Sequence, residues 1–331
     1  MKFPNTRMRR TRKHEWSRLL TGENQISVND LIWPVFIQEA PTTKVESMPG
    51  VKRYDIDDLL AAITDAVELG IKSVAIFPCV DSRNKDANGT MALDKDNFLY
   101  QAIKLVKAKF PSLGLIADVA LDPYTDHGHD GVLDDEGYVD NDRTIEILSQ
   151  LAINLAEAGV DVVAPSDMQD GRIEIIRGAL ELEGYKDCII LSYTAKYASS
   201  FYGPFRDAVG SSNAIKNKSK AHYQMDFSNS EEAILEAQLD ISEGADWLMV
   251  KPAMPYLDII AKMTDRFSHP IFAYQVSGEY AMLMDLSSRL QISPEVLFYE
   301  SLMGLKRAGA CAFLTYAAPM MAAYLKRHTC K

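Results

Sequence analysis

The chain has 331 residues, of which 47% are hydrophobic and 24% charged, with a formal net charge of -11 and a pI of about 5.1. These values are typical of a soluble globular protein of one large or two modest domains, and the acidic balance argues against nucleic-acid binding by bulk electrostatics. No apolar stretch reaches transmembrane length, and the basic N-terminus lacks the apolar region of a secretory signal. We therefore expect a cytoplasmic protein with no membrane partner, in which Cys79, Cys188, Cys311 and Cys330 are reduced and mostly buried thiols.

Residues 1–25 form a basic segment that differs from the acidic remainder of the chain. The segment contains Lys2, Arg7, Arg9, Arg10, Arg12, Lys13 and Arg18, and Glu15 is the early acid that faces them. A disordered tail, a transit peptide and an arm that packs on another, acidic subunit all fit this composition. The segment is poor in serine and runs almost directly into the first predicted strand. Residues 26–331 are expected to form a single catalytic domain.

Eight short apolar runs recur along this domain, and each has the length and composition of a strand buried on both faces. They are 31–37, 73–78, 113–120, 160–165, 188–193, 246–251, 271–276 and 310–316. Amphipathic segments predicted as helices separate most of them, including 56–69, 97–109, 142–158, 173–182, 230–243 and 294–308. Several of these end at a glycine that can adopt the left-handed helix stop, namely Gly70, Gly159, Gly244 and Gly309. The pattern predicts a (β/α)8 TIM barrel. A doubly wound open sheet is the alternative, and it is disfavoured by the count of eight and by the absence of a glycine-rich phosphate loop.

In such a barrel the chemistry lies at the carboxyl ends of the strands, where two lysines stand out. Lys251 ends the sixth apolar run and Lys196 follows the fifth. Lys251 alone is also consistent with a strand-end lysine whose stem is buried and whose amine reaches solvent. Neighbouring strands lie about 4.8 Å apart, so the two amines are expected to be close. Desolvation and mutual repulsion then lower the pKa of a lysine and favour the neutral amine that forms a Schiff base with a carbonyl.

The connection at about 197–228 is unusually long for a compact domain, which favours a lid over the active site, with a disordered surface insertion as the alternative. Its glycines Gly203 and Gly210 are possible hinges. Its basic residues Arg206, Lys216, Lys218 and Lys220 are suited to meeting an anionic substrate, and its aromatic residues to excluding water.

Four stretches around the predicted strand ends are distinctive, namely 164–168, 192–206, 249–258 and 274–280. They closely resemble the signatures of the porphobilinogen synthase (5-aminolevulinate dehydratase) family, and the resemblance extends from the basic segment to the end of the chain. It implies condensation of two molecules of 5-aminolevulinate to porphobilinogen with loss of two waters, in tetrapyrrole (haem) synthesis. It also implies that residues 1–25 are an arm that wraps a neighbouring subunit in a homo-octamer.

The resemblance further implies a role for individual residues. Lys251 would bind the first substrate as a Schiff base, with its carboxylate on Ser277 and Tyr316, and Lys196 would bind the second substrate. Arg206 and Lys220 would bind the second carboxylate from the lid, with Gln224 nearby. Further substrate contacts are expected from Tyr202, Phe205, Tyr274, Asp122, Asp130 and Ser166.

The chain departs from zinc-dependent members of the family at three positions where those members carry cysteines. Ala120, Asp122 and Asp130 stand there, so no catalytic zinc is expected and activity should resist zinc-selective chelation. Asp122 and Asp130 could bind a hard cation or water, or position the substrate amine. His127 and His129 resemble a ligand pair, but hydrogen bonding within the loop is the expected role. The resemblance implies the magnesium-responsive class, with allosteric Mg²⁺ at Glu236 and a monovalent cation near the active site.

Two other functions remain open from the residues alone. A class I aldolase on the same fold would need a single essential lysine. A catalytically idle assembly protein would use only the acidic barrel and the basic arm. Intact Lys196, Lys251 and lid charges speak against the second of these.

Overall fold

The computed structural model describes residues 1–209 and 219–329. Residues 210–218 and 330–331 lie outside this range. They include Gly210, Lys216 and Lys218 of the expected lid, and Cys330.

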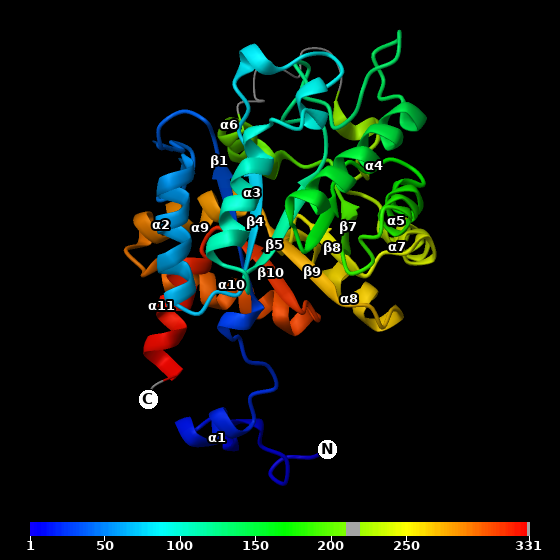
Figure 1. Ribbon diagram of the computed structural model, residues 1–331. Helices are drawn as coiled ribbons and strands as arrows, with labels where there is room; N and C mark the ends of the chain where they lie inside the picture. Colours follow the sequence, from blue (N-terminus) through cyan, green and yellow to red (C-terminus); the bar gives the residue numbers. More distant parts are fainter. Residues whose placement is uncertain (210–218, 330–331) are drawn as a thin grey trace.

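Eight parallel strands close into a barrel with helices around it, as the sequence predicts (Figure 1). The barrel closes because β10 pairs with both β9 and β1. Its strands are β1 (Leu31–Ile37), β4 (Ser73–Pro78), β5 (Gly114–Val119), β6 (Val162–Pro165), β7 (Ile189–Lys196), β8 (Trp247–Lys251), β9 (Ile271–Gln275) and β10 (Ala312–Thr315). All eight predicted runs are strands, and the largest change is that β7 continues to Lys196 instead of ending at Tyr193.

The helices cover the outside of the barrel, and six of the nine given next follow the predicted segments closely. They are α2 (Ile56–Glu68), α3 (Phe98–Lys109), α4 (Asn141–Ala158), α5 (Arg172–Leu182), α7 (Glu231–Glu243), α8 (Leu257–Arg266), α9 (Ser277–Leu290), α10 (Pro294–Ala308) and α11 (Ala318–Thr329). Gly159, Gly244 and Gly309 stop α4, α7 and α10 with φ of 107°, 105° and 112°, in the left-handed region that glycine adopts without strain.

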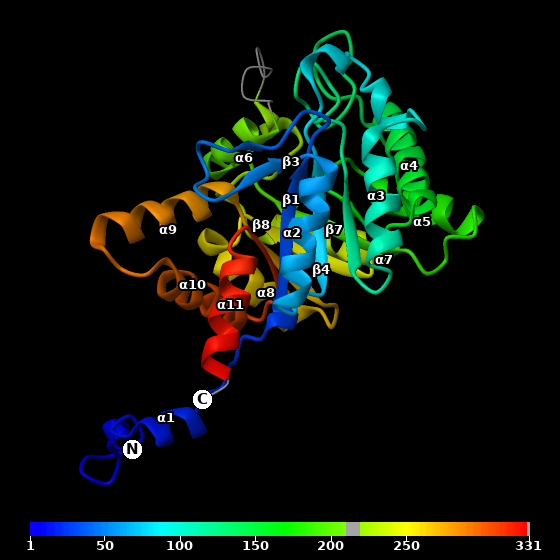
Figure 2. The ribbon, with the colours of Figure 1, turned by 60° about the vertical axis from the view of Figure 1, so that its left-hand side comes forward.

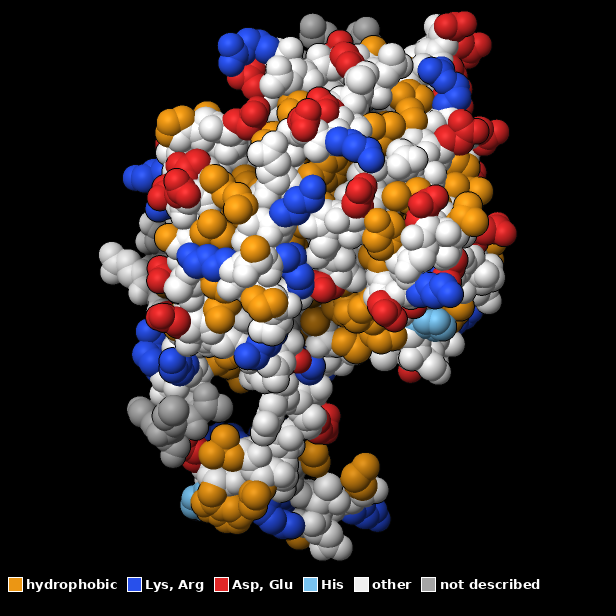
Figure 3. Space-filling model, viewed as in Figure 1, with side chains coloured by type: hydrophobic (Ala, Val, Ile, Leu, Met, Phe, Trp, Pro, Cys, Tyr) orange, Lys and Arg blue, Asp and Glu red, His pale blue; other side chains and the backbone are white. Residues whose placement is uncertain are grey.

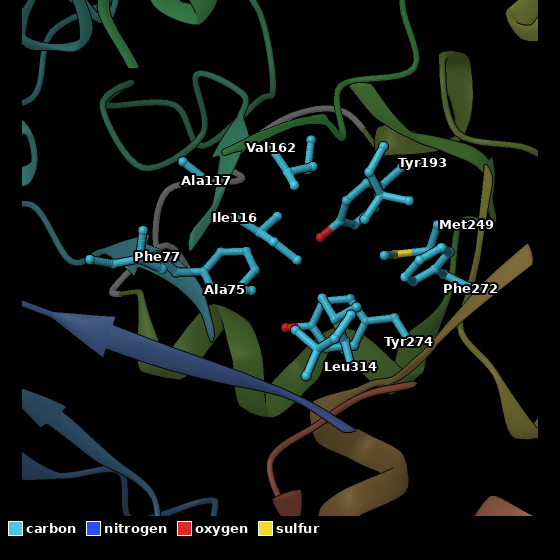
Figure 4. Packing of buried hydrophobic residues seen from close by; sticks show 14 of the residues in the cluster. Ala75, Phe77, Ile116, Ala117, Val162, Tyr193, Met249, Phe272, Tyr274 and Leu314 are labelled. Atoms are coloured by element: carbon cyan, nitrogen blue, oxygen red, sulfur yellow. The ribbon is translucent and has the colours of Figure 1, made fainter. Parts of the chain in front are cut away.

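Bulky side chains fill the barrel interior. Figure 4 shows Phe77, Tyr193 and Tyr274 among the buried residues, with their rings directed toward the barrel interior. Side chains fill the interior of such a small barrel, so it is a packed core and not a pore. Active sites of this fold lie at the rim formed by the carboxyl ends of the strands. A short hairpin of β2 (Thr43–Lys44) and β3 (Lys52–Tyr54), which the sequence did not reveal, adds to this rim beside β1.

The long connection after β7 is partly helical in its described part. It contains a 3-10 turn (Ser200–Tyr202), helix α6 (Gly203–Ala208) and a second 3-10 turn (Lys220–His222). A parallel bridge between Tyr197 and Met225 ties its two ends together. The backbone is therefore anchored on both sides of the residues that lie outside the described range.

The N-terminal segment projects away from the barrel, on the side opposite the carboxyl ends of the strands (Figure 2). It contains a 3-10 turn (Met8–Arg10) and helix α1 (Glu15–Leu20), so it is not wholly irregular. Phe3, Trp16, Leu19 and Leu20 are between 64% and 79% exposed, and Figure 3 shows hydrophobic side chains gathered on this segment. In this chain alone, the segment buries little of its own apolar surface.

No helix in the described ranges combines the length and apolar character needed to cross a bilayer. Cys188 is buried and Cys79 partly buried, but Cys311 is exposed, so the expectation of burial was wrong for that residue. Cys311 directly precedes β10, at the rim where the chain enters the barrel.

Candidate active site

The carboxyl ends of β7 and β8 place the two lysines side by side. Lys196 and Lys251 are direct partners in the parallel register of these strands, as the sequence predicts. Both are nearly inaccessible, with 5% and 6% of their surface exposed. A register irregularity between Ser192 and Ala195 precedes the pair. Two primary amines therefore share one buried pocket.

Lys251 lies in an aromatic cage. Its Nζ atom is 4.7–5.3 Å from the ring centroids of four residues, which are Tyr193, Tyr202, Phe205 and Tyr274. No described side chain forms a hydrogen bond or ion pair with this amine. Burial, reinforced by the nearby Lys196 charge, lowers the pKa of Lys251 to about 7. The neutral amine is thus well populated at neutral pH, as nucleophilic attack on a carbonyl requires.

Lys196 has polar partners that Lys251 lacks. Its Nζ atom lies 3.4 Å from Asp130 Oδ2 and donates a hydrogen bond to the carbonyl oxygen of Ser166. The sequence did not reveal this difference between the two amines. The two lysines consequently differ in chemistry, one held among rings and the other in a polar network.

The lid reaches the same network from the other side. Lys220 Nζ lies 3.0 Å from Asp130 Oδ1 and 3.4 Å from Asp122 Oδ2, and Gln224 donates to Asp130 at 3.4 Å. Burial alone would raise the pKa of Asp130, but the ammonium groups of Lys196 and Lys220 hold it well below its usual range. Burial raises the pKa of Asp122, with Lys220 opposing the rise. The site thus brings together Lys196, Lys220, Gln224, Asp122 and Asp130, as expected.

The residues expected to bind the first carboxylate lie on the opposite side of Lys251. Tyr316 and Tyr274 share a hydrogen bond of 2.9 Å between their hydroxyl groups. Ser277, the first residue of α9, is fully buried, and its hydroxyl accepts a hydrogen bond from the backbone N–H of Phe205 at 2.8 Å. This contact connects the candidate carboxylate site to the lid.

The first part of the lid covers Lys251. Tyr202 donates its hydroxyl to the carbonyl oxygen of Lys251 at 3.1 Å, and the Phe205 ring packs against Phe36 and Phe77. Arg206 lies on the same helix and is half-buried. The aromatic part of the lid therefore limits the access of water to the amine.

Asp118 is a functional candidate that the sequence analysis missed. It lies on β5, and one of its carboxylate oxygens is buried without a hydrogen-bond partner among the described residues. Burial raises the pKa of Asp118 to about 7, against the opposing charge of Lys251. An acid inside the otherwise apolar run Leu115–Val119 was a visible signal in the sequence. Its carboxyl group can exchange protons near neutral pH, next to the two amines.

Glu236 lies away from this pocket, on α7 outside the barrel. Burial and the neighbouring acids Asp240, Asp170 and Glu232 raise the pKa of its carboxyl group to about 7, while Arg172 opposes the rise. Among the described residues, no hydrogen bond or ion pair neutralises it. A crowded, unpaired carboxylate has the chemistry of a ligand for a hard cation.

His127 and His129 take part in loop hydrogen bonds, as expected. His127 Nε2 lies 3.1 Å from the carbonyl oxygen of Ala87, and its Nδ1 accepts the backbone N–H of His129. His129 Nδ1 lies 3.3 Å from the Tyr223 hydroxyl, and burial lowers the pKa of this imidazole to about 4. Within the described ranges, no group of three or more His, Cys, Asp or Glu residues is arranged to hold a metal.

Comparison with known proteins connects this geometry to a family. A family model described as delta-aminolevulinic acid dehydratase matches residues 5–324. Proteins with this name are 48% identical in Rhodobacter capsulatus, covering 97% of this chain and 96% of that protein, and 46% identical in Bradyrhizobium diazoefficiens, covering 97% and 91%. The crystal structure of delta-aminolevulinic acid dehydratase (porphobilinogen synthase) from Toxoplasma gondii, in complex with its product porphobilinogen, is 46% identical. It covers 96% of this chain and 91% of that one, with a TM-score of 0.94. The chain belongs to the delta-aminolevulinic acid dehydratase (porphobilinogen synthase) family.

Proposed function

We propose that this chain condenses two molecules of 5-aminolevulinate to porphobilinogen through one Schiff base on Lys251 and a second on Lys196. The observation that carries the proposal is the register of β7 and β8, which places two buried amines side by side. A pyrrole-formation assay with 5-aminolevulinate, run with and without magnesium, potassium and zinc, tests it directly.

Lys251 is the better nucleophile and binds the first substrate. Its neutral amine attacks the ketone carbon, and loss of the carbonyl oxygen as water leaves the imine. Asp118, whose pKa is also about 7, would take up and return protons during this dehydration. The substrate carboxylate is held by the hydroxyl groups of Ser277 and Tyr316, on the far side of the amine.

Lys196 binds the second substrate, and the lid supplies the positive charge for its carboxylate. Lys220 is already drawn into the pocket by Asp122 and Asp130, and Arg206 lies on the lid helix. The buried Gln224 side chain leaves its carbonyl oxygen without a partner among the described residues, which suits it to accept a substrate N–H. Bond formation between the two bound substrates then closes the pyrrole with overall loss of two waters.

The lowered pKa of Lys251 predicts a pH dependence for the first Schiff base. With a pKa of about 7, the neutral fraction rises from about one tenth at pH 6 to about nine tenths at pH 8. Borohydride trapping of substrate on Lys251 should therefore increase about tenfold over this range in a single-turnover experiment. A midpoint near the ordinary pKa of lysine would contradict the assignment.

Magnesium fits the region around Glu236 better than the catalytic pocket. Glu236 would be its protein ligand, with waters completing the shell, as Mg²⁺ prefers. When bound, the ion would offset the negative charge of the crowded acids on α7 and in the loop before α5, and it would act from outside the pocket. Asp122 and Asp130 already face Lys220, and with Ala120 they offer no thiolate for zinc. We accordingly propose allosteric Mg²⁺ and no catalytic zinc, and retain a monovalent cation near the pocket as a further proposal.

The Glu236→Gln variant is expected to lose magnesium stimulation. The substitution keeps the size of the side chain but removes the charge that attracts the cation. Turnover with and without added Mg²⁺ should become equal in the variant, whereas the parent chain is faster with the ion. The ratio of the two rates in each protein is the measurement, and an undiminished ratio in the variant would place the magnesium site elsewhere.

We also propose that residues 1–25 pack on a second copy within a homo-octamer. Exposed apolar side chains on the projecting arm support this, as does its positive charge against a body with net negative charge.

A further inference from the structure

Glu279 is a buried acid for which the proposed reaction provides no direct role. It lies in the first turn of α9, two residues after Ser277, and is fully inaccessible. No lysine, arginine or histidine among the described residues forms an ion pair with it. An unpaired buried carboxylate is costly unless several hydrogen bonds satisfy it, so its partners indicate what it does.

The Glu279 carboxylate joins two strand ends. One oxygen accepts the backbone N–H of Val276 at 2.6 Å and that of Ala253 at 3.2 Å, and the other accepts the N–H of Met254 at 2.5 Å. Val276 connects β9 to α9. Ala253 and Met254 follow β8, directly after Lys251 and Pro252. A single side chain therefore fixes the segment that carries Lys251 relative to the segment that carries Ser277.

Helix capping alone does not account for this arrangement. An acid in the first turn of a helix commonly accepts the N–H just before that helix, and the Val276 contact is of this kind. The Ala253 and Met254 contacts come from the segment that follows β8, not from the start of α9. Three N–H donors also favour the ionised form, in which both oxygens accept, although burial raises the pKa of Glu279 to about 7.

The same turn is closely packed against the base of the lid. A Cβ atom on Gly278 would lie 2.5 Å from the carbonyl oxygen and 2.8 Å from the Cα atom of Phe201. The turn therefore has little freedom to shift toward the lid. Its position relative to β8 is set from the other side, by the bonds from Glu279.

This geometry matters because one substrate must reach both segments. In 5-aminolevulinate two methylene groups separate the ketone carbon from the carboxylate. The ketone must meet Lys251 while the carboxylate meets Ser277. Resting on the proposed function of these two residues, we propose that Glu279 is a positioning residue that fixes the spacing between Lys251 and Ser277 and so matches the pocket to a 4-keto acid.

Two ketones distinguish this role from general structural support. Levulinate carries both the ketone and the carboxylate, whereas 2-butanone carries only the ketone. Each ketone is trapped on Lys251 with borohydride at limiting ketone concentration, and the labelled peptide is quantified by mass analysis. The ratio of levulinate labelling to 2-butanone labelling is the preference for the acid. In Glu279→Gln this preference should fall by about tenfold, because binding through the carboxylate is lost, while trapping of 2-butanone changes little.

Matched variants sharpen the test. Ser277→Ala should lose the same preference, and the double variant should lose no more than either single variant, because both act through one contact. Asp55→Asn is the control, since Asp55 also accepts backbone N–H groups from two segments, Thr42 and Asp58, but lies at the start of α2. The Asp55→Asn variant should show the same preference for levulinate over 2-butanone as the parent chain. If Glu279→Gln does not fold, Glu279→Asp replaces it, with a smaller loss expected because the charge remains.

Two outcomes would overturn the proposal. An unchanged preference in the Glu279 variant would reduce the residue to a helix cap. An equal fall for both ketones would mean that it supports the Lys251 amine or the fold in general. Failure of the parent chain to label Lys251 with either ketone would instead refute the proposed function on which the inference rests.

Discussion

Lys251→Met is expected to lower porphobilinogen formation by about 10⁴-fold or more, since removal of a covalent nucleophile typically has effects of this size. Methionine keeps an unbranched apolar stem among the rings of Tyr193, Tyr202, Phe205 and Tyr274 but has no amine. The fold should therefore tolerate the change. Turnover by a pyrrole assay and borohydride labelling of the protein are the measurements.

Lys196→Met provides the matched comparison, because it removes the partner amine from the adjacent strand. It should also abolish turnover, but Lys251 should still be labelled by the first substrate. Lys262→Met, a change of the same type in a surface lysine paired with Glu231, should retain parental activity. Full porphobilinogen formation by Lys196→Met, with labelling confined to Lys251, would contradict the two-lysine mechanism, because a single Schiff base would then suffice.

The barrel and the lysine pair could be predicted because their signals are local and repeated. Each strand is a short apolar run, and glycines such as Gly159 and Gly309 mark helix ends. Once the runs are counted as parallel strands, the adjacency of Lys196 and Lys251 follows from strand order alone. The β2–β3 hairpin was not predicted because two and three mainly polar residues give no periodic signal.

The environment of each amine could not be predicted, because it depends on side chains brought together from distant parts of the chain. Asp130 reaches Lys196 across 66 positions, and the rings around Lys251 come from β7, β9 and the lid. Sequence spacing indicated that the amines were close, but not that one was paired and the other unpaired. Glu279 lay within the signature stretch 274–280, and its role depends on N–H groups from the segments that follow β8 and β9.

The structure also contains a buried ionic cluster centred on Arg172, whose loss should have the largest effect on stability. Arg172 is 2% exposed and bonds to Gln169 O at 3.2 Å, Ser192 Oγ at 3.0 Å and Asp240 Oδ1 at 3.3 Å. Its Nε atom lies 3.6 Å from Asp167. The guanidinium thus connects the loop after β6, strand β7 and helix α7, because its donors are spread over a planar fork that the single ammonium group of lysine could not match.

Arg172→Met should reduce the free energy of unfolding by about 3–5 kcal/mol, because it leaves the buried carboxylates of Asp167 and Asp240 without their cation. Guanidinium-induced unfolding is the measurement. Arg266→Met is the control. Its exposed pair with Glu231 should contribute no more than about 1 kcal/mol.

The loss of unfolding free energy in Arg172→Met should also depend on pH, and Asp167 determines the direction of that dependence. Burial raises the pKa of this carboxyl group to about 6 even with Arg172 opposing the rise, and loss of the arginine raises it further. A carboxyl group whose pKa is higher in the folded than in the unfolded chain binds more protons when folded. Its contribution to stability therefore falls as pH rises above the unfolded value. The difference in unfolding free energy between parent and variant should accordingly be largest above pH 7 and shrink as pH falls through about 6. A difference that does not change with pH would mean that lost packing, and not the unpaired acids, destabilises the variant.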